Sequence, residues 1–295
     1  MVVFLVKRGD QNQFLYETDV EKDVDEVVKD ITAIFNGRLK VTRICYEIEE
    51  LSKHGTFWPP EMQGLNEDQI QELKLEDPWA KRCAPPNHVF CKDDMGRRCG
   101  LAPPANMQDI LKKASDDAKE FISKKHVDLR KCLTQKDVTR ALDELRGATK
   151  IVFPGGLPPH DPVRMELDNV EDLTGTQAAN EVIDPNRACL WACGKKLISG
   201  NKLKNHLGKN NKSKVTIKLC SNSEGAPGRE PVMSEDERKQ LMLHAYRKQE
   251  EWKKLEQDDD DNYLDSKWAD GQNLKRHFHG LNNISWKPLM NMKND

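Results

Sequence analysis

Two short apolar segments joined by a turn open the chain, and they limit the folds that it can adopt more than any other feature. Residues 2–7 are nearly all apolar, residues 8–12 favour a turn, and residues 13–17 again carry aliphatic and aromatic side chains. This pattern predicts a β-hairpin. Thr18 and Glu21 have the spacing of a capping box, which predicts that a helix begins there.

The helix predicted after the hairpin has one apolar face, whose residues recur with a period of about 3.6. Gly37 favours the end of this helix, because glycine readily adopts the left-handed conformation of a C-terminal cap. A hairpin followed by a helix is typical of a β-grasp, or ubiquitin-like, fold. We therefore predict an α+β fold in which an N-terminal ubiquitin-like sheet with helical insertions spans residues 1–165. The apolar face comprises Val20, Val24, Val27, Val28, Ile31, Ile34 and Phe35.

The sequence up to residue 165 supplies candidates for the other strands and for the inserted helices. Short segments of high β-propensity are the candidate strands, at 89–92, 97–101 and 149–153. Helical periodicity predicts the insertions at 39–51, 66–75, 107–125 and 134–146.

Three further regions are predicted after the sheet, and together they form a mainly helical C-terminal part. Residues 166–224 are expected to be a helical basic region, with one helix over 175–183 and another after Asp184 and Pro185. Residues 225–257 hold a linker and a long amphipathic helix, which a second capping-box pattern begins at Ser234. Residues 258–295 hold four aspartates that stop this helix and an extended, aromatic-anchored docking segment.

The long helix and the C-terminal segment both carry candidate partner-binding residues. The helix has one narrow apolar stripe, which predicts one partner surface in this chain or in another. The stripe consists of Leu241, Ala245, Trp252 and Leu255. Aromatic residues in the polar C-terminal segment are expected to dock into grooves, either on the core of this chain or on a partner. These residues are Tyr263, Trp268, Phe278 and Trp286.

A basic stretch is the strongest local charge signal, because no acidic residue occurs between Pro185 and Ser223. The whole chain has a net charge of only −2, so this local excess favours binding to an acidic protein surface. An ordinary solvated face is the alternative. Nucleic acid is a poor candidate partner, because Trp191 is the one aromatic residue of the stretch. Its candidate binding residues are Lys195, Lys196, Lys202, Lys204, Lys209, Lys212, Lys214 and Lys218.

Motifs of catalysis, cofactor binding and metal binding are missing from the sequence. It has no phosphate-binding loop, no dinucleotide fingerprint, no zinc-protease motif and no nucleophile elbow. The spacing of Cys83, His88, Cys91 and Cys99 is wide for structural zinc. Cys189 and Cys193 have helical spacing, which favours two buried small side chains, and His277 and His279 have no further ligand at suitable spacing. We predict no enzyme activity, no cofactor and no metal.

Hydropathy predicts a soluble intracellular protein without membrane insertion. No apolar run approaches the roughly 18 residues of a membrane-spanning helix, and the first residues lack the pattern of a signal peptide. In a reducing compartment the eight cysteines are expected to be mostly free thiols.

Longer sequence segments are distributed over nearly the whole chain, at 6–10, 36–41, 59–60, 62–65, 70–75, 122–125, 156–159, 172–178, 225–227, 239–243, 268–270 and 274–280. Together these segments resemble the Kurly family, also called cilia- and flagella-associated protein 298. The resemblance implies a role in cilium motility, especially in assembling outer dynein arms, and in orienting cilia across a tissue. It also implies a location in the cytoplasm and at the basal body or axoneme.

Two classes of function remain open after this resemblance. The first is an assembly or scaffold protein, whose partners are dynein assembly factors and axonemal dynein subunits. The second is a resident component of the axoneme or basal body, whose basic stretch meets tubulin. The resemblance implies no catalytic residues for either class.

Overall fold

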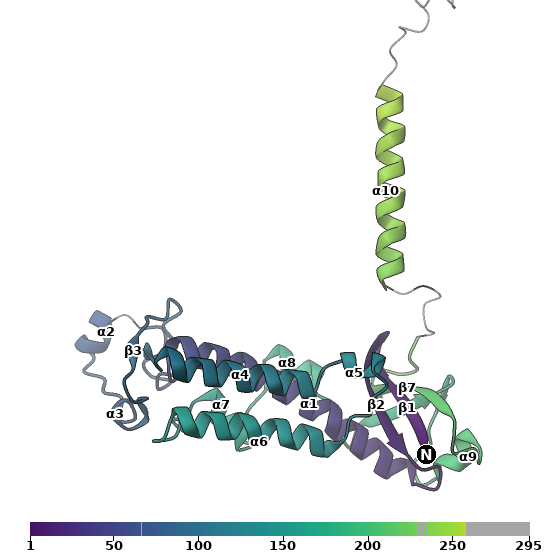
Figure 1. Cartoon of the computed structure of the whole chain (residues 1–295), viewed down its shortest axis with the longest axis horizontal. Coiled ribbons are helices and arrows are strands. Elements are labelled where there is room, and N and C mark those ends of the chain that lie inside the picture. The colour runs from purple at the N-terminus through teal and green to yellow at the C-terminus, as the bar shows by residue number, and fades with distance from the viewer. Residues whose placement is uncertain (66, 229–232, 234, 258–295) are drawn as a thin grey trace, which may run out of the picture. The chain divides into compact units, whose positions relative to one another are not determined.

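The computed structural model describes residues 1–65, 67–228, 233 and 235–257 of the chain (Figure 1). The chain divides into two units, Met1–Glu230 and Pro231–Asp295, and each is described by itself. The first unit is an α+β structure, and the second contains one long helix.

A five-stranded sheet, in the order β2-β1-β7-β5-β6, forms one end of the first unit. The predicted hairpin is confirmed, since β1 (Val2–Arg8) and β2 (Gln11–Thr18) are antiparallel. On its other side, β1 pairs in parallel with β7 (Lys214–Ser221). Strand β5 (Ala188–Ala192) is antiparallel both to β7 and to β6 (Lys195–Lys196). The sheet therefore joins the N-terminal hairpin to strands that come almost 200 residues later.

The sheet does not close near residue 165, and the region predicted as helical supplies three of its strands. Segments 89–92 and 97–101 contribute instead to a separate two-stranded sheet of β3 (Val89–Phe90) and β4 (Leu101–Ala102). Residues 149–153 are not a strand, because 149–152 are the last turn of α6 (Gln135–Val152). Pro185 does not begin a helix, and the apolar run that follows it is the buried strand β5.

Helix α1 (Val24–His54) is a single helix of 31 residues that crosses the sheet and continues beyond it (Figure 1). The predicted packing is confirmed, because Val24, Val27, Ile31 and Ile34 are all buried. The predicted capping box at Thr18 is wrong, since Thr18 belongs to β2 and α1 begins after Asp23.

Gly37 does not end a helix, and it lies inside α1 where α6 packs closely. A β-carbon at this position would lie 2.6 Å from Cγ1 of Val138. The predicted helix over 39–51 is consequently the second half of α1. Glycine at position 37 permits a close approach of two helices rather than a turn.

The long connection between α1 and β5 is mostly helical. Helices α4 (Ala105–Phe121), α6 and α7 (Pro162–Leu167) pack along α1, and α4 and α6 also pack against each other (Figure 1). Thr134 and Asp137 form a reciprocal capping box at the start of α6. Helices predicted at 66–75, 107–125, 134–146 and 175–183 are confirmed, with different ends. The short helices are α2 (Glu67–Glu72), α3 (Ala80–Cys83), α5 (Lys125–Asp128), α8 (Gln177–Glu181) and α9 (Leu203–Leu207).

A fully buried carboxylate connects the proline-rich loop before α7 to the segment that follows α1. Asp161 accepts hydrogen bonds from the backbone amides of Phe57 at 3.2 Å and Val163 at 3.0 Å. Burial raises the pKa of Asp161, and the positive charge of Arg98 opposes this rise. This carboxylate therefore holds together two backbone segments that are far apart in the sequence.

The second unit consists, in its described part, of Met233 and α10 (Glu235–Gln257), which confirms the predicted long helix. All of its described side chains, those of 235–254, are exposed to solvent. Ser234 and the segment 258–295 lie outside the described residues.

Candidate partner-binding surface

The eight lysines predicted to bind a partner lie on or next to strands β5 to β7, and the structure divides them into two groups. Lys202 and Lys204 belong to the first group, because both contact Glu21, at 3.3 and 2.9 Å. The hydrogen bond from Lys204, and then that from Lys202, lowers the pKa of Glu21. These two lysines are therefore neutralised by a carboxylate that precedes α1.

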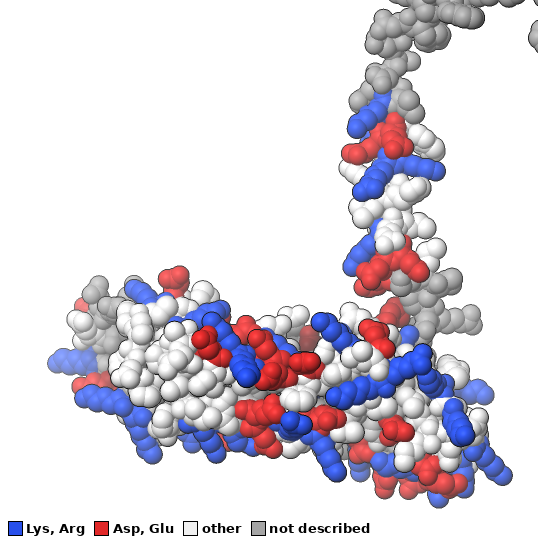
Figure 2. All heavy atoms as spheres, viewed as in Figure 1, with Lys and Arg blue, Asp and Glu red and all other residues white. Residues whose placement is uncertain are grey.

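Lys218 is also neutralised, and it is buried in β7. Its ammonium group donates to the carbonyl oxygen of Gly228 at 2.9 Å and lies 3.6 Å from a carboxylate oxygen of Asp10. Lys196 donates to the side-chain oxygen of Asn222, which is neutral. In Figure 2 positive side chains lie beside acidic ones over the sheet end of the first unit. The surface around the basic stretch therefore includes acidic residues from other parts of the sequence, although the stretch itself has none.

The second group keeps its positive charge. Lys195, Lys196, Lys209, Lys212 and Lys214 are exposed, and no carboxylate of the described residues lies within ion-pair distance of them. Lys209 and Lys212 belong to the loop 208–213, which precedes β7 and is ordered by its own hydrogen bonds.

Hydrogen bonds hold the loop 208–213 in place, and three of them involve residues 210–213. The side-chain oxygen of Asn210 accepts from the amide of Lys212 at 3.0 Å, and the hydroxyl of Ser213 donates to the carbonyl of Asn210 at 3.1 Å. The amide of Val3 donates to the carbonyl of Ser213 at 3.1 Å. The loop therefore presents its lysines from a backbone attached to the sheet.

One face of the sheet lies next to this loop, and the strand register shows which residues belong to it. Val2, Phe4 and Val6 of β1 are buried, whereas their alternate neighbours point to the opposite face of the sheet. Residues directly opposite each other in register share a face. Val3 pairs with Lys214, Leu5 pairs with both Leu15 and Thr216, and Lys218 pairs with Trp191. We call this surface the outer face: Val3, Leu5, Leu15, Trp191, Lys214, Thr216 and Lys218.

A hollow of about 740 Å³ lies on the outer face. Half-buried Trp191, exposed Thr216 and exposed Lys214 line it, together with the turn at Cys193 and Gly194. The segment 227–228 lines it as well. This arrangement combines an aromatic side chain, aliphatic neighbours and uncompensated positive charge in one place.

The cysteine predictions are partly wrong. Cys189 is a buried residue of β5, and its thiol donates to the carbonyl of Cys220 at 3.4 Å. Cys193 is exposed in a turn with a positive φ of 50°, so the two cysteines do not share a helix. Among the residues that the structure describes, no three His, Cys, Asp or Glu side chains form a group that could hold a metal ion.

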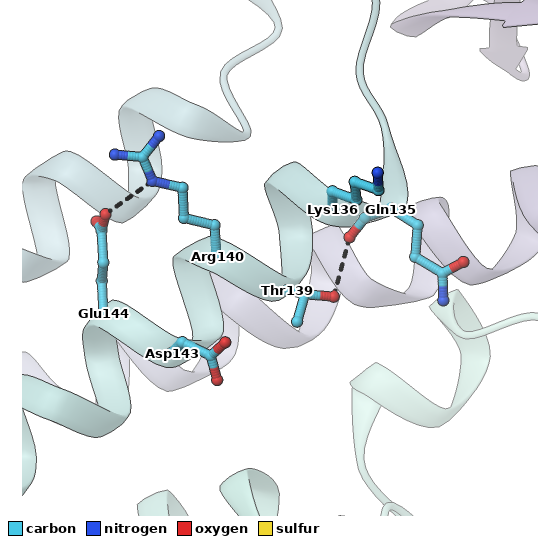
Figure 3. Close-up of a pocket in the computed structure, with 6 residues that line it drawn as sticks. All are labelled: Gln135, Lys136, Thr139, Arg140, Asp143 and Glu144. Carbon is cyan, nitrogen blue, oxygen red and sulfur yellow. Dashed lines mark hydrogen bonds and ion pairs between the residues drawn. The ribbon is translucent and has the colours of Figure 1, made fainter.

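Another hollow, of about 620 Å³, lies on α6 and is lined by residues of this helix alone (Figure 3). Arg140 and Glu144 point toward each other and form an ion pair at 3.2 Å, and Thr139 donates to the carbonyl of Gln135 at 3.0 Å. These are contacts typical of an exposed helix surface, and the side chains converge on no common point.

No helix in the described part of the chain combines the length and apolar character needed to cross a membrane.

The predicted binding residues of the C-terminal half fall into two classes. Leu241 and Trp252 lie on α10 and are 55% and 67% exposed. The side chain of Leu255 and the residues Tyr263, Trp268, Phe278 and Trp286 lie outside the described part of the structure.

Sequence reasoning missed Trp191 and Thr216 as part of the surface. The alternation of Val215, Ile217 and Leu219 with polar residues was the available signal, because it indicates a strand with one exposed face.

Comparison with known proteins gives consistent results over almost the full length of the chain. A family model described as "Cilia- and flagella-associated protein 298" matches residues 188–284, which include β5 to β7 and α10. A zebrafish (Danio rerio) protein of that name is 53% identical over 98% of this chain and 100% of its own. The proteins of that name from Homo sapiens and Drosophila melanogaster are 52% and 51% identical, over 98% and 97% of this chain and 100% and 99% of their own. No solved structure matches the chain.

Proposed function

Because the chain belongs to the family of cilia- and flagella-associated protein 298, we propose that it acts in cilium motility as a non-enzymatic factor for outer dynein arm assembly. The observation that carries this proposal is the identity of about half of all residues, over nearly the whole chain, with proteins named for cilia and flagella. A protein of this kind acts through its surfaces, and a role in positioning cilia across a tissue accompanies it.

The proposed partners are dynein assembly factors and axonemal dynein subunits, and the proposed location is the cytoplasm and the cilium, at the basal body or axoneme. Exposed residues of two kinds support binding to proteins. The loop 208–213 and Lys214 carry uncompensated positive charge, and α10 exposes Leu241 and Trp252. Several exposed large apolar side chains on one helix favour a protein partner, and α10 exposes Leu241, Met242, Leu243, Tyr246 and Trp252. The proposal includes no nucleic acid and no membrane insertion.

We also propose that the sheet and α1 form a β-grasp, or ubiquitin-like, fold. A central β1 that is antiparallel to β2 and parallel to the last strand, β7, supports this assignment. In this fold the connection between α1 and β5 has grown into the helical insertion 55–187. The outer face would then be the sheet surface that the helix leaves uncovered.

The second candidate function is a resident component of the axoneme or basal body that binds tubulin. The exposed lysines of the loop 208–213 favour it, because tubulin would offer them an acidic surface. The two candidates predict different fractions after detergent extraction of cilia. An assembly factor is released with the soluble cytoplasm, whereas a resident component stays with the axoneme.

Deletion of the gene in a ciliated cell, followed by electron microscopy of axonemes, tests the proposal. The expected result is immotile cilia in which the outer arms are missing and the microtubule doublets are intact. Re-expression of the wild-type chain should restore the arms. Motile cilia with a normal set of outer arms would contradict the proposal.

A further inference from the structure

We propose that the outer face, together with the loop 208–213, binds an acidic segment of a partner protein that carries an apolar anchor side chain. This inference rests on the proposed function only in that the surface serves a protein partner. It names the chemistry of that partner, which the family relationship does not supply.

Charge complementarity is the first argument. Lys212 and Lys214 project from the loop and the adjoining end of β7 without a carboxylate of the described residues within ion-pair distance. Lys202 and Lys204 lie nearby in sequence but contact Glu21, and Lys218 contacts Asp10. The uncompensated positive charge therefore lies at Lys212 and Lys214, where it attracts a negatively charged partner.

The apolar character of the outer face is the second argument. Trp191 is half-buried, and Val3, Leu5 and Leu15 are each partly exposed on the same face. Purely electrostatic binding would not need these side chains. Aromatic residues at the centre of a charged rim are the usual anchors of protein interfaces.

The size of the hollow indicates a peptide segment rather than a folded surface. Its volume of about 740 Å³ accommodates a few side chains. The hollow follows β7 from Lys214 to Lys218, a rise of roughly 13 Å, which is the length of about four extended residues. A short acidic segment with one or two apolar side chains fits these dimensions.

Direct binding of a synthetic peptide to the full-length protein tests the proposal. The probe is a labelled peptide of glutamates with a central phenylalanine and leucine, and fluorescence anisotropy measures its affinity. One comparison peptide replaces each glutamate by glutamine, and another replaces the two apolar residues by serine. Only the first peptide should bind tightly, and its affinity should fall as salt is raised.

Substitutions of Thr216 test whether affinity depends on the sign of the charge in the hollow, because Thr216 is exposed and lines it. Thr216→Glu should weaken binding of the acidic peptide roughly tenfold, and Thr216→Lys should strengthen it by a similar factor. The pair Lys212→Glu and Lys214→Glu should weaken binding at least as much. Lys112→Glu with Lys113→Glu on α4 makes the same change of charge at exposed positions away from the sheet, and it should alter affinity less than about twofold.

Several results would overturn the proposal. They are equal affinity of both Thr216 variants, equal binding of the glutamine peptide, or tighter binding of a single-stranded oligonucleotide than of the acidic peptide. Binding that appears only after Asp258 to Asp261 are replaced by serine would assign the outer face to the chain's own acidic segment. A dimer in sedimentation that Thr216→Glu dissociates would assign it to a second copy. Peptide binding is measured without cilia, so its failure leaves a loss of dynein arms on deletion intact as a separate result.

Discussion

The two long helices of the protein, α1 and α10, differ in what surrounds them. Helix α1 buries 13 of its 31 residues, including Val27, Ile31 and Ile44, whereas every described side chain of α10 is exposed. Packing stabilises α1. Helix α10 instead carries opposite charges at i, i+4 spacing, such as Glu235 with Lys239 and Glu250 with Lys254. Tertiary packing therefore stabilises α1, whereas the described side chains of α10 can stabilise it only through contacts within the helix.

The largest expected effect follows from placing a charge in the packed helix. Ile31→Asp should prevent stable folding, because an unpaired buried carboxylate costs several kcal/mol and a domain is stable by only about 5–15 kcal/mol. Circular dichroism during heating measures the loss. Lys29→Asp introduces the same side chain at an exposed position of α1 and should melt close to wild type. Equal melting of both variants would contradict the packing described.

A smaller effect is expected where α1 meets α6. Gly37→Ala should destabilise the protein by about 1–3 kcal/mol, because the added methyl group collides with the stiff side chain of Val138. Helix propensity alone predicts the opposite sign. Gly147→Ala on α6 is the control, since its methyl group meets no atom within 4 Å, and it should stabilise the protein slightly. Adding Val138→Ala to Gly37→Ala should recover part of the loss, and chemical denaturation of these three variants and of wild type measures it.

The ion pair between Arg8 and Glu224 holds the segment after β7. It should contribute less than about 1 kcal/mol to the free energy of unfolding, because both side chains are partly exposed. Glu224 accepts two hydrogen bonds of 2.6 Å from Arg8, and this lowers the pKa of Glu224 below its usual 4.5. A lowered carboxylate pKa stabilises the folded state above the unfolded pKa, and the effect disappears as pH falls through the folded pKa. The advantage of wild type over Glu224→Gln should therefore be fully present above the usual pKa of 4.5 and should vanish as pH falls through the lower folded pKa. An advantage that persists in strong acid would contradict this assignment.

The smallest effect is expected in α10. Leu241→Asp should change the melting temperature of the isolated protein very little, because surface substitutions usually alter stability by no more than about 0.5 kcal/mol. Amide hydrogen exchange along α10 should also be faster than along α1. A large loss of stability would show that Leu241 is packed against another part of the protein.

Local signals in the sequence were sufficient for the hairpin, the apolar face of α1 and the long helix α10. They failed where the local structure depends on contacts with residues far away in the sequence. Gly37 has the appearance of a helix end, yet its role depends on Val138 of another helix. The pairing of β1 with β7 joins residues about 210 positions apart, and neither strand specifies its partner locally.

The candidate site shows the same limit. The absence of acidic residues between Pro185 and Ser223 correctly marks a basic segment. However, Glu21 and Asp10 come from the N-terminal region and neutralise three of its lysines. Which lysines keep their charge is a property of the folded surface, because the neutralising carboxylates lie nearly 200 residues away in sequence.

Complementation of motility in cells that lack the protein tests the central claim most directly, namely that function depends on an exposed charged surface separate from the packed core. The variant Lys212→Glu with Lys214→Glu should melt like wild type and yet fail to restore beating and outer dynein arms. The control variant Lys112→Glu with Lys113→Glu should restore both. Full restoration by the Lys212 and Lys214 variant, at equal protein level, would contradict the account.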